Sequence, residues 1–316
     1  MRTYLKLLSV PLLIVMLGIV GCASSASQPA LMPDLVELPA EATAAVPEAT
    51  ADPAAVVVMN MIERVNAEDY AGAADYFADD AMIYLAGMPP TGMEIYRGKE
   101  QYRTFLEECC TGANFVYEVI PERVEGNVVF ASGKTWMDFT RELGVAPNSW
   151  HEIFVVEDGK IALYDSTITE EALAIFKPAL RKAIPELFEA ALPEGETPVD
   201  EITIAIANGT CGYDGPLTLQ AGELTVNVDV QDQNWDKYAM SFFTLDEGKD
   251  MFDLMASTAR PGPPPWSNMV FLEELSPGES QTYKSRIAEA GLLYMVCWAG
   301  SPDIAIGNAG PFVVKK

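Results

Sequence analysis

The sequence predicts an α+β domain with one curved antiparallel sheet, followed by an all-β sandwich. Apolar residues recur at helical spacing over 56–65, and strand-like stretches with short turns then fill 114–168. Helices followed by consecutive strands indicate a sheet with helices on one face. After residue 199 the pattern becomes strict alternation, as at Ile202 and Ile204, which is typical of half-buried strands.

Composition limits the classes of function. The chain has 316 residues, of which 49% are hydrophobic, enough to bury at least one sizeable core. Asp and Glu number 46 against 20 Lys and Arg, which argues against a nucleic-acid partner because phosphate binding needs clustered cations. The single histidine excludes metal sites that need two imidazoles, so we expect no metal and no other cofactor.

The N-terminus reads as an export signal. Residues 1–21 hold two basic residues and then an apolar run that Pro11 interrupts, too short for a permanent span of about 20 residues. Ile19-Val20-Gly21-Cys22 resembles the bacterial lipobox. That resemblance implies lipidation at Cys22 and an anchor on the extracytoplasmic side of the cell envelope; the alternative is an ordinary signal peptide with an incidental cysteine. Residues 22–53, rich in Pro and Ala, are expected to be a disordered tether.

The first folded domain is expected over 54–182. Its predicted helices are an amphipathic one over 56–65, a short one over 69–77, and a third that opens at Gly98. A turn at 78–81 precedes a strand at 82–85, and further strands are expected at 114–120, 127–140, 148–157 and 160–168. Gly159 supplies the positive φ of a tight hairpin turn over 157–160.

Three motifs in this domain resemble the SnoaL-like branch of the nuclear transport factor two-like superfamily. They are Phe77-Ala78-Asp79-Asp80-Ala81, Tyr96-Arg97-Gly98-Lys99-Glu100 and Glu157-Asp158-Gly159-Lys160-Ile161. The resemblance implies a cone with an internal pocket, a fold that cyclases, isomerases, epoxide hydrolases and non-catalytic binders share. It therefore implies an apolar small molecule in the cone, or a homodimer contact through its sheet.

The family's enzymes aim carboxylates, Tyr or His into an apolar pocket, where burial shifts the pKa. Strand alternation puts His151 and Glu152 on opposite faces of the sheet, so they cannot both face the pocket. His151 paired with Asp165 could act as an oriented general base. No sequence pattern typical of a nucleophile accompanies that pair. Each candidate also has a non-catalytic interpretation. The aspartates would be solvated or paired with Lys or Arg, the histidine would be a structural or surface residue, and the aromatic residues would belong to the hydrophobic core. The candidates are Tyr84, Tyr117, Trp136, Asp138, His151, Glu152 and Asp165, with Trp136 and Asp138 expected on one strand face.

A helix is expected over 176–191, limited by Pro178 and Pro185, and the segment 183–198 as a whole is a helix and linker between the domains. The second domain then covers 199–316. Its short alternating strands predict a β-sandwich with a helical insert near 247–256. The expected strands lie near 202–207, 224–231, 237–245, 268–274, 279–288, 291–298 and 310–315.

The end of this domain resembles a Greek-key cupredoxin, from Tyr294-Met295-Val296-Cys297 to Gly310-Pro311-Phe312. The family's ligands are missing, because Asp303 and Asn308 stand where that family has His and Met. We therefore expect no type 1 copper site. With its ligand role gone, Cys297 is expected to form a disulfide with Cys211, which an oxidising envelope permits; the alternative is two buried thiols.

Cys109 and Cys110 are neighbours at the end of the third predicted helix. A bond between adjacent cysteines is strained, so the pair is expected as two thiols or as a labile disulfide.

The favoured hypothesis is a lipid-anchored envelope protein with a binding cone and an interaction sandwich, without catalysis. The alternative is a SnoaL-like cyclase, isomerase or hydrolase that acts by general acid–base catalysis on an apolar small molecule.

Overall fold

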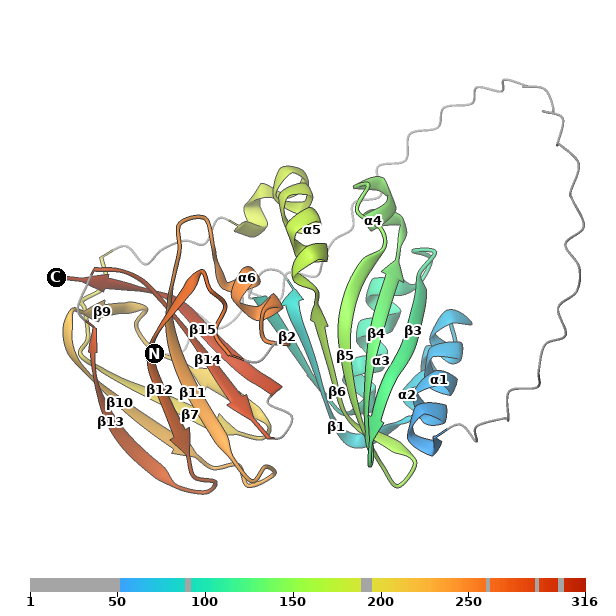
Figure 1. The fold of residues 1–316 in the computed structure, drawn as a ribbon, viewed down its shortest axis with the longest axis horizontal. Coiled ribbons are helices and arrows are strands. Elements are labelled where there is room, and N and C mark those ends of the chain that lie inside the picture. The colour runs from blue at the N-terminus through green and yellow to red at the C-terminus, as the bar shows by residue number, and fades with distance from the viewer. Residues whose placement is uncertain (1–51, 89–91, 189–194, 260–261, 288–289, 301–303) are drawn as a thin grey trace, which may run out of the picture. The chain divides into compact units, whose positions relative to one another are not determined.

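The computed structural model describes residues 52–88, 92–188, 195–259, 262–287, 290–300 and 304–316 (Figure 1). The expected signal segment 1–21, the lipidation site Cys22 and nearly all of the tether 22–53 lie outside the described residues. None of the described helices is long and apolar enough to cross a membrane.

Three helices open the described chain. Helix α1 (Pro53–Asn66) begins at Asp52, whose side chain accepts a hydrogen bond of 2.9 Å from the Ala54 amide. Helix α2 (Tyr70–Ala74) is short, and α3 (Gly98–Cys110) buries a stripe at every fourth residue. These helices lie where the apolar spacing predicted them, and together they cover one face of the first sheet (Figure 1).

The first sheet has six strands in the order β2-β1-β6-β5-β4-β3. All its neighbouring strands are antiparallel except β1 and β6, which run parallel. The prediction of a purely antiparallel sheet was therefore wrong at this pair, because β1 and β6 are far apart in sequence and no hairpin fixes their direction. The strands are β1 (Phe77–Met88), β2 (Gly92–Arg97), β3 (Val116–Glu125), β4 (Val128–Trp136), β5 (Asn148–Glu157) and β6 (Lys160–Ile168).

Local predictions in this sheet differ from the structure in two places. The turn expected at 78–81 lies inside β1, where the register with β6 is irregular between Phe77 and Met82. The strand expected over 127–140 ends at Trp136, and α4 (Asp138–Glu142) follows. An ion pair of 3.2 Å between Arg141 and Asp138 favours that helical turn, so Trp136 and Asp138 do not share a strand face. The Gly159 turn is confirmed, with φ of 75°.

Helix α5 (Glu170–Ala183) starts six residues before the helix expected over 176–191. The Thr169 hydroxyl caps it by accepting a hydrogen bond of 3.2 Å from the Ala172 amide. Proline disfavours a helical conformation in the residue before it, so the helix stops ahead of Pro185 and a short η1 (Pro185–Phe188) follows.

The C-terminal region is made of two sheets, in the orders β13-β10-β7-β8 and β12-β11-β14-β15-β9. Both sheets contribute to one apolar core, consistent with a β-sandwich. The short strands β8 and β9 were not predicted, whereas helix α6 (Met251–Ala256) lies at the expected insert. The strands are β7 (Glu201–Ala207), β8 (Thr210–Tyr213), β9 (Thr218–Gln220), β10 (Gly222–Val230), β11 (Tyr238–Leu245), β12 (Ser267–Leu275), β13 (Ser280–Ile287), β14 (Gly291–Ala299) and β15 (Ile304–Lys315).

Two apolar clusters lie on the two faces of the six-stranded sheet. On the inner face, Ile83 and Tyr164 pack with α1 and α3. On the outer face, Tyr84, Ala86 and Leu163 belong to the same cluster as the core of the two C-terminal sheets. Part of the outer face is therefore covered by the C-terminal region.

A disulfide joins the two C-terminal sheets. It links Cys211 on β8 to Cys297 on β14, the pairing that was expected, across a sequence separation of 86. Both cysteines are buried.

Replacing this pair, Cys211→Ala with Cys297→Ala, should lower the free energy of unfolding by about 3–5 kcal/mol, because the unfolded chain loses a long-range constraint. Urea unfolding followed by circular dichroism measures the change. The matched control is Cys109→Ala with Cys110→Ala, which removes a bond that closes no long loop and should change the unfolding free energy far less. Equal effects of the two double variants would contradict the expectation.

Candidate functional site

A polar cluster lies on the inner face of the sheet, inside the cone. Glu152 on β5 and Tyr164 on β6 point to this face, as does Tyr117 on β3, and all three are buried. The register places Glu152 opposite Ser166 on β6. Alternation along three strands thus brings four polar side chains into one apolar interior.

Direct hydrogen bonds link three members of the cluster. The Tyr117 hydroxyl donates to Glu152 Oε1 at 2.7 Å and lies 2.7 Å from the Tyr164 hydroxyl. Because a hydroxyl has one hydrogen, Tyr164 donates to Tyr117 when Tyr117 donates to Glu152. The second carboxyl oxygen, Glu152 Oε2, is buried and has no hydrogen-bond partner among the described residues. The described residues therefore leave one hydrogen-bonding position of the carboxyl group unused.

Gly133 on β4 makes room for the carboxyl group. A Cβ atom at this position would lie 2.3 Å from Glu152 Oε1 and 3.1 Å from its Cδ. Contacts that short force the carboxyl group to move, so only glycine at residue 133 allows the observed position of Glu152.

Burial controls the ionisation of the cluster. Desolvation raises the pKa of Glu152 to about 8, against the opposing effect of the hydrogen bond from Tyr117. Burial, and then the proximity of Glu152, raises the pKa of Tyr117 and that of Tyr164 well above the usual 10. At neutral pH the carboxyl group is therefore mostly protonated and both phenols keep their hydrogens.

Apolar walls flank the cluster on two sides. The ring of Tyr164 stacks on Phe154 at 4.6 Å between centroids and meets Tyr102 of α3 edge-on at 5.9 Å. On the other side, Trp150 and Ile168 pack with α5 and α6 in a separate apolar cluster. The carboxyl group of Glu152 thus lies between an aromatic wall and an apolar wall that includes two helices.

An ion-pair network holds those two helices together. The Lys177 ammonium of α5 lies 2.8 Å from Asp250 and 2.5 Å from Asp253, at the start of α6. The outer side of this contact is an open groove of about 640 Å³, whose lining includes Leu173 and Trp266 but none of the polar residues inside the cone.

The structure separates the other predicted candidates from the cluster. Asp165 and Tyr84 lie on the outer face, where the Tyr84 hydroxyl donates to the Gly209 carbonyl at 2.7 Å. Burial raises the pKa of Asp165 to about 7. Asp138 on α4 is half-exposed and accepts a hydrogen bond of 2.8 Å from the Asn114 side-chain amide.

His151 is exposed and also lies on the outer face, so the predicted His151–Asp165 pair does not form inside the cone. Trp136 pairs with the exposed Val116 and faces outward too. Of the seven candidates, Tyr117 and Glu152 meet on the inner face, and Tyr84 and Asp165 are register partners on the outer face. Tyr164 was missed, because its role depends on the register between β5 and β6, which alternation within one strand does not reveal. Among the described residues no group of His, Cys, Asp and Glu could hold a metal ion.

Part of the chain is similar to a known protein family. Residues 58–164 match the family described as SnoaL-like domain. No curated protein matches the chain significantly.

Solved structures with similar folds cover little more than a third of the chain. A putative ketosteroid isomerase from Kribbella flavida is 15% identical, and the match covers 37% of this chain and 77% of that protein, with a TM-score of 0.30. A LEH-like epoxide hydrolase of M. tuberculosis is 17% identical, and the match covers 42% of this chain and 96% of that protein, with a TM-score of 0.30. An NTF2-like protein of unknown function from Cytophaga hutchinsonii is 17% identical, and the match covers 38% of this chain and 94% of that protein, with a TM-score of 0.31.

The raised pKa of Glu152 predicts a pH dependence of stability. The folded state keeps its proton up to about pH 8, whereas the unfolded chain loses it near 4.5, so stability falls as the pH rises between these values. Glu152→Gln has no carboxyl group to titrate here, so its free energy of unfolding should not fall in this way. The difference in free energy of unfolding, variant minus wild type, should therefore rise with pH by at most about 1.4 kcal/mol per pH unit. Urea unfolding at pH 5, 6, 7 and 8 measures the difference. The exposed Glu118→Gln serves as the control, and a constant difference for Glu152→Gln would contradict a buried proton.

Proposed function

We propose that the cone binds an apolar small molecule that carries one hydrogen-bond acceptor, and that Glu152 donates to that acceptor. One observation carries the proposal: Glu152 Oε2 is buried without a hydrogen-bond partner among the described residues, beside aromatic and aliphatic side chains. A buried polar atom without a hydrogen bond destabilises the protein, so a ligand group that pairs with it gains affinity.

The protonation state selects the chemistry of the ligand. With a pKa of about 8, Glu152 holds a hydrogen at neutral pH, and Oε1 already accepts from Tyr117. A neutral carboxyl group with its hydrogen on Oε2 favours a carbonyl or ether oxygen of the ligand over an anionic group. Aromatic residues such as Phe154 and Trp150 suit a flat apolar body for the rest of the ligand.

Binding is favoured over catalysis because the interior holds a single acid. Three carboxylates are buried in the described part of the chain, Glu152, Asp165 and Asp232. Asp165 lies on the outer face, and Asp232 accepts the Gly209 amide in the C-terminal region. A second titrating group beside the ligand, which proton abstraction would need, is thus missing from the inner face among these carboxylates.

General acid–base catalysis is the second candidate function. The observation in its favour is the pKa of about 8 at Glu152, close to the value that suits a proton donor near neutral pH.

Matched aromatic probes test the proposed ligand class. We expect 2-acetylnaphthalene to bind about five- to tenfold more tightly than 2-ethylnaphthalene, the effect of one net hydrogen bond of about 1 kcal/mol. The affinity for the ketone should fall as the pH rises through about 8, because Glu152 loses its hydrogen. Fluorescence titration at pH 6 to 9 measures both effects.

Two variants make this titration specific. Glu152→Gln keeps a hydrogen-bond donor, so it should bind the ketone with an affinity that does not depend on pH. Asp165→Asn alters the buried acid on the outer face and should leave the pH dependence of ketone binding unchanged. Equal affinities for the two probes would overturn the binding proposal. Exchange of the ketone's methyl hydrogens with D₂O, followed by NMR, would favour the catalytic candidate.

We further propose that the C-terminal region is a cupredoxin-like sandwich that serves as an interaction surface without copper. Its support is that Cys297, which stands where the family has a copper ligand, is bound to Cys211. The proposed homodimer contact is restricted to the β3–β5 part of the outer sheet face, where Val116 and Ile120 are 45% and 50% exposed. The rest of that face belongs to the shared core.

We also propose lipid anchoring at Cys22, on the strength of the lipobox-like sequence. Cells grown with an alkyne-labelled fatty acid should incorporate the label into the wild-type chain and not into Cys22→Ser. Gel fluorescence after click labelling measures the incorporation, with Cys109→Ser as the control that keeps it. Label retained in Cys22→Ser would contradict the proposal.

A further inference from the structure

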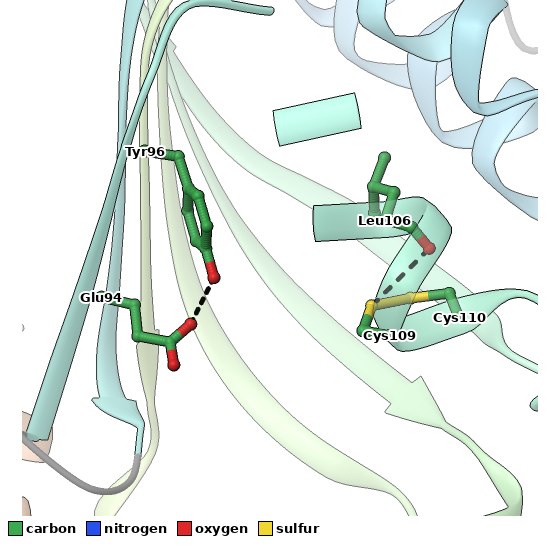
Figure 2. The surroundings of a disulfide bond; sticks show 5 residues. All are labelled: Glu94, Tyr96, Leu106, Cys109 and Cys110. Atoms are coloured by element: carbon green, nitrogen blue, oxygen red, sulfur yellow. Dashed lines mark hydrogen bonds between the residues drawn. A yellow bond between two sulfur atoms is a disulfide. The ribbon is translucent and has the colours of Figure 1, made fainter. Parts of the chain in front are cut away.

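A second disulfide joins the adjacent residues Cys109 and Cys110 at the end of α3 (Figure 2). Their Cα atoms are 3.8 Å apart, which is the spacing that a trans peptide imposes on any two neighbours. Ordinary disulfides join Cα atoms roughly 4.4–6.8 Å apart, and shorter spans are more easily reduced. Covalent geometry alone therefore makes this bond the more reducible of the two.

The two sulfur atoms differ in accessibility. Cys110 is 1% exposed and continues the buried stripe of α3 that includes Tyr102 and Leu106. Cys109 is partly exposed, and its Sγ lies 3.9 Å from the Leu106 carbonyl (Figure 2). An incoming thiolate can thus reach Cys109, with Cys110 as the leaving group.

Acidic residues lie near this position. Glu107 and Glu108 precede the disulfide and are exposed, with Glu107 paired to Arg103 at 3.5 Å, and Glu94 on a neighbouring strand accepts a hydrogen bond from Tyr96 (Figure 2). Negative charge repels anionic thiols such as glutathione and favours uncharged or cationic ones. The neighbourhood therefore selects the class of reductant.

We propose that Cys109–Cys110 is a thiol–disulfide exchange site for an uncharged or cationic dithiol. One thiolate of the dithiol attacks Cys109 Sγ, and the bond to Cys110 breaks, leaving a thiolate that takes a proton from water. The second thiol of the reductant, as its thiolate, attacks the sulfur bound to Cys109 and releases the Cys109 thiolate, which is protonated. The protein gains two electrons and two protons, and the dithiol becomes a disulfide.

The Cys211–Cys297 bond is the internal reference for the test. Both of its cysteines are buried, at 7% and 0% exposure, and they lie on strands of the two C-terminal sheets. The full chain is treated at pH 7.5 with dithiothreitol, quenched with iodoacetamide and mapped by mass spectrometry, so that every cysteine is followed separately. Cys109 and Cys110 should be labelled at least tenfold faster than Cys211 and Cys297.

Charge selection is tested with two monothiols in the same assay. Neutral 2-mercaptoethanol should form the mixed disulfide at Cys109 faster than anionic glutathione. The double variant Glu107→Gln with Glu108→Gln should increase the rate of the glutathione reaction and leave the rate with 2-mercaptoethanol unchanged. Labelling of both cysteine pairs at one rate, or native protein with free thiols at 109 and 110, would overturn the exchange site. Equal rates for the two monothiols would overturn its selectivity.

Discussion

The inner chemistry of the cone depends on holding one carboxyl group away from water. Desolvation favours the protonated form of Glu152, and the fold accommodates that group with Gly133 for space and Tyr117 for a hydrogen bond. Tyr164 completes the chain of donors. Each neighbour contributes a neutral hydroxyl rather than a counter-charge, so the cluster remains uncharged and compatible with an apolar ligand.

The C-terminal region takes part in building the cone. Its core continues onto the outer sheet face through Tyr84 and Leu163, and its helix α6 packs with α5 beside Trp150. The Lys177 side chain, 10% exposed, ties these helices together through Asp250 and Asp253, and screening by salt is weak at a partly buried pair. The cone and the C-terminal sheets therefore share part of their apolar packing.

The two disulfides of the described chain have contrasting settings. Cys211–Cys297 links two sheets through the interior of the C-terminal region, so it constrains a long stretch of the unfolded chain. Cys109–Cys110 constrains only neighbours and lies at the end of α3, where Cys109 is partly exposed. Stability is thus the natural role of the first bond, and reactivity that of the second.

The sequence by itself determined the elements whose signal is local. Helical spacing located α1 and α3, the Gly159 turn fixed a hairpin, and alternation put Glu152 and His151 on opposite faces. Only the tertiary structure decided which face is inside, that β1 runs parallel to β6, and that Tyr164 rather than Asp165 meets Glu152. The reason is physical: alternation has a period of two and gives two equivalent faces, and only packing against α3 or against the C-terminal core makes them different.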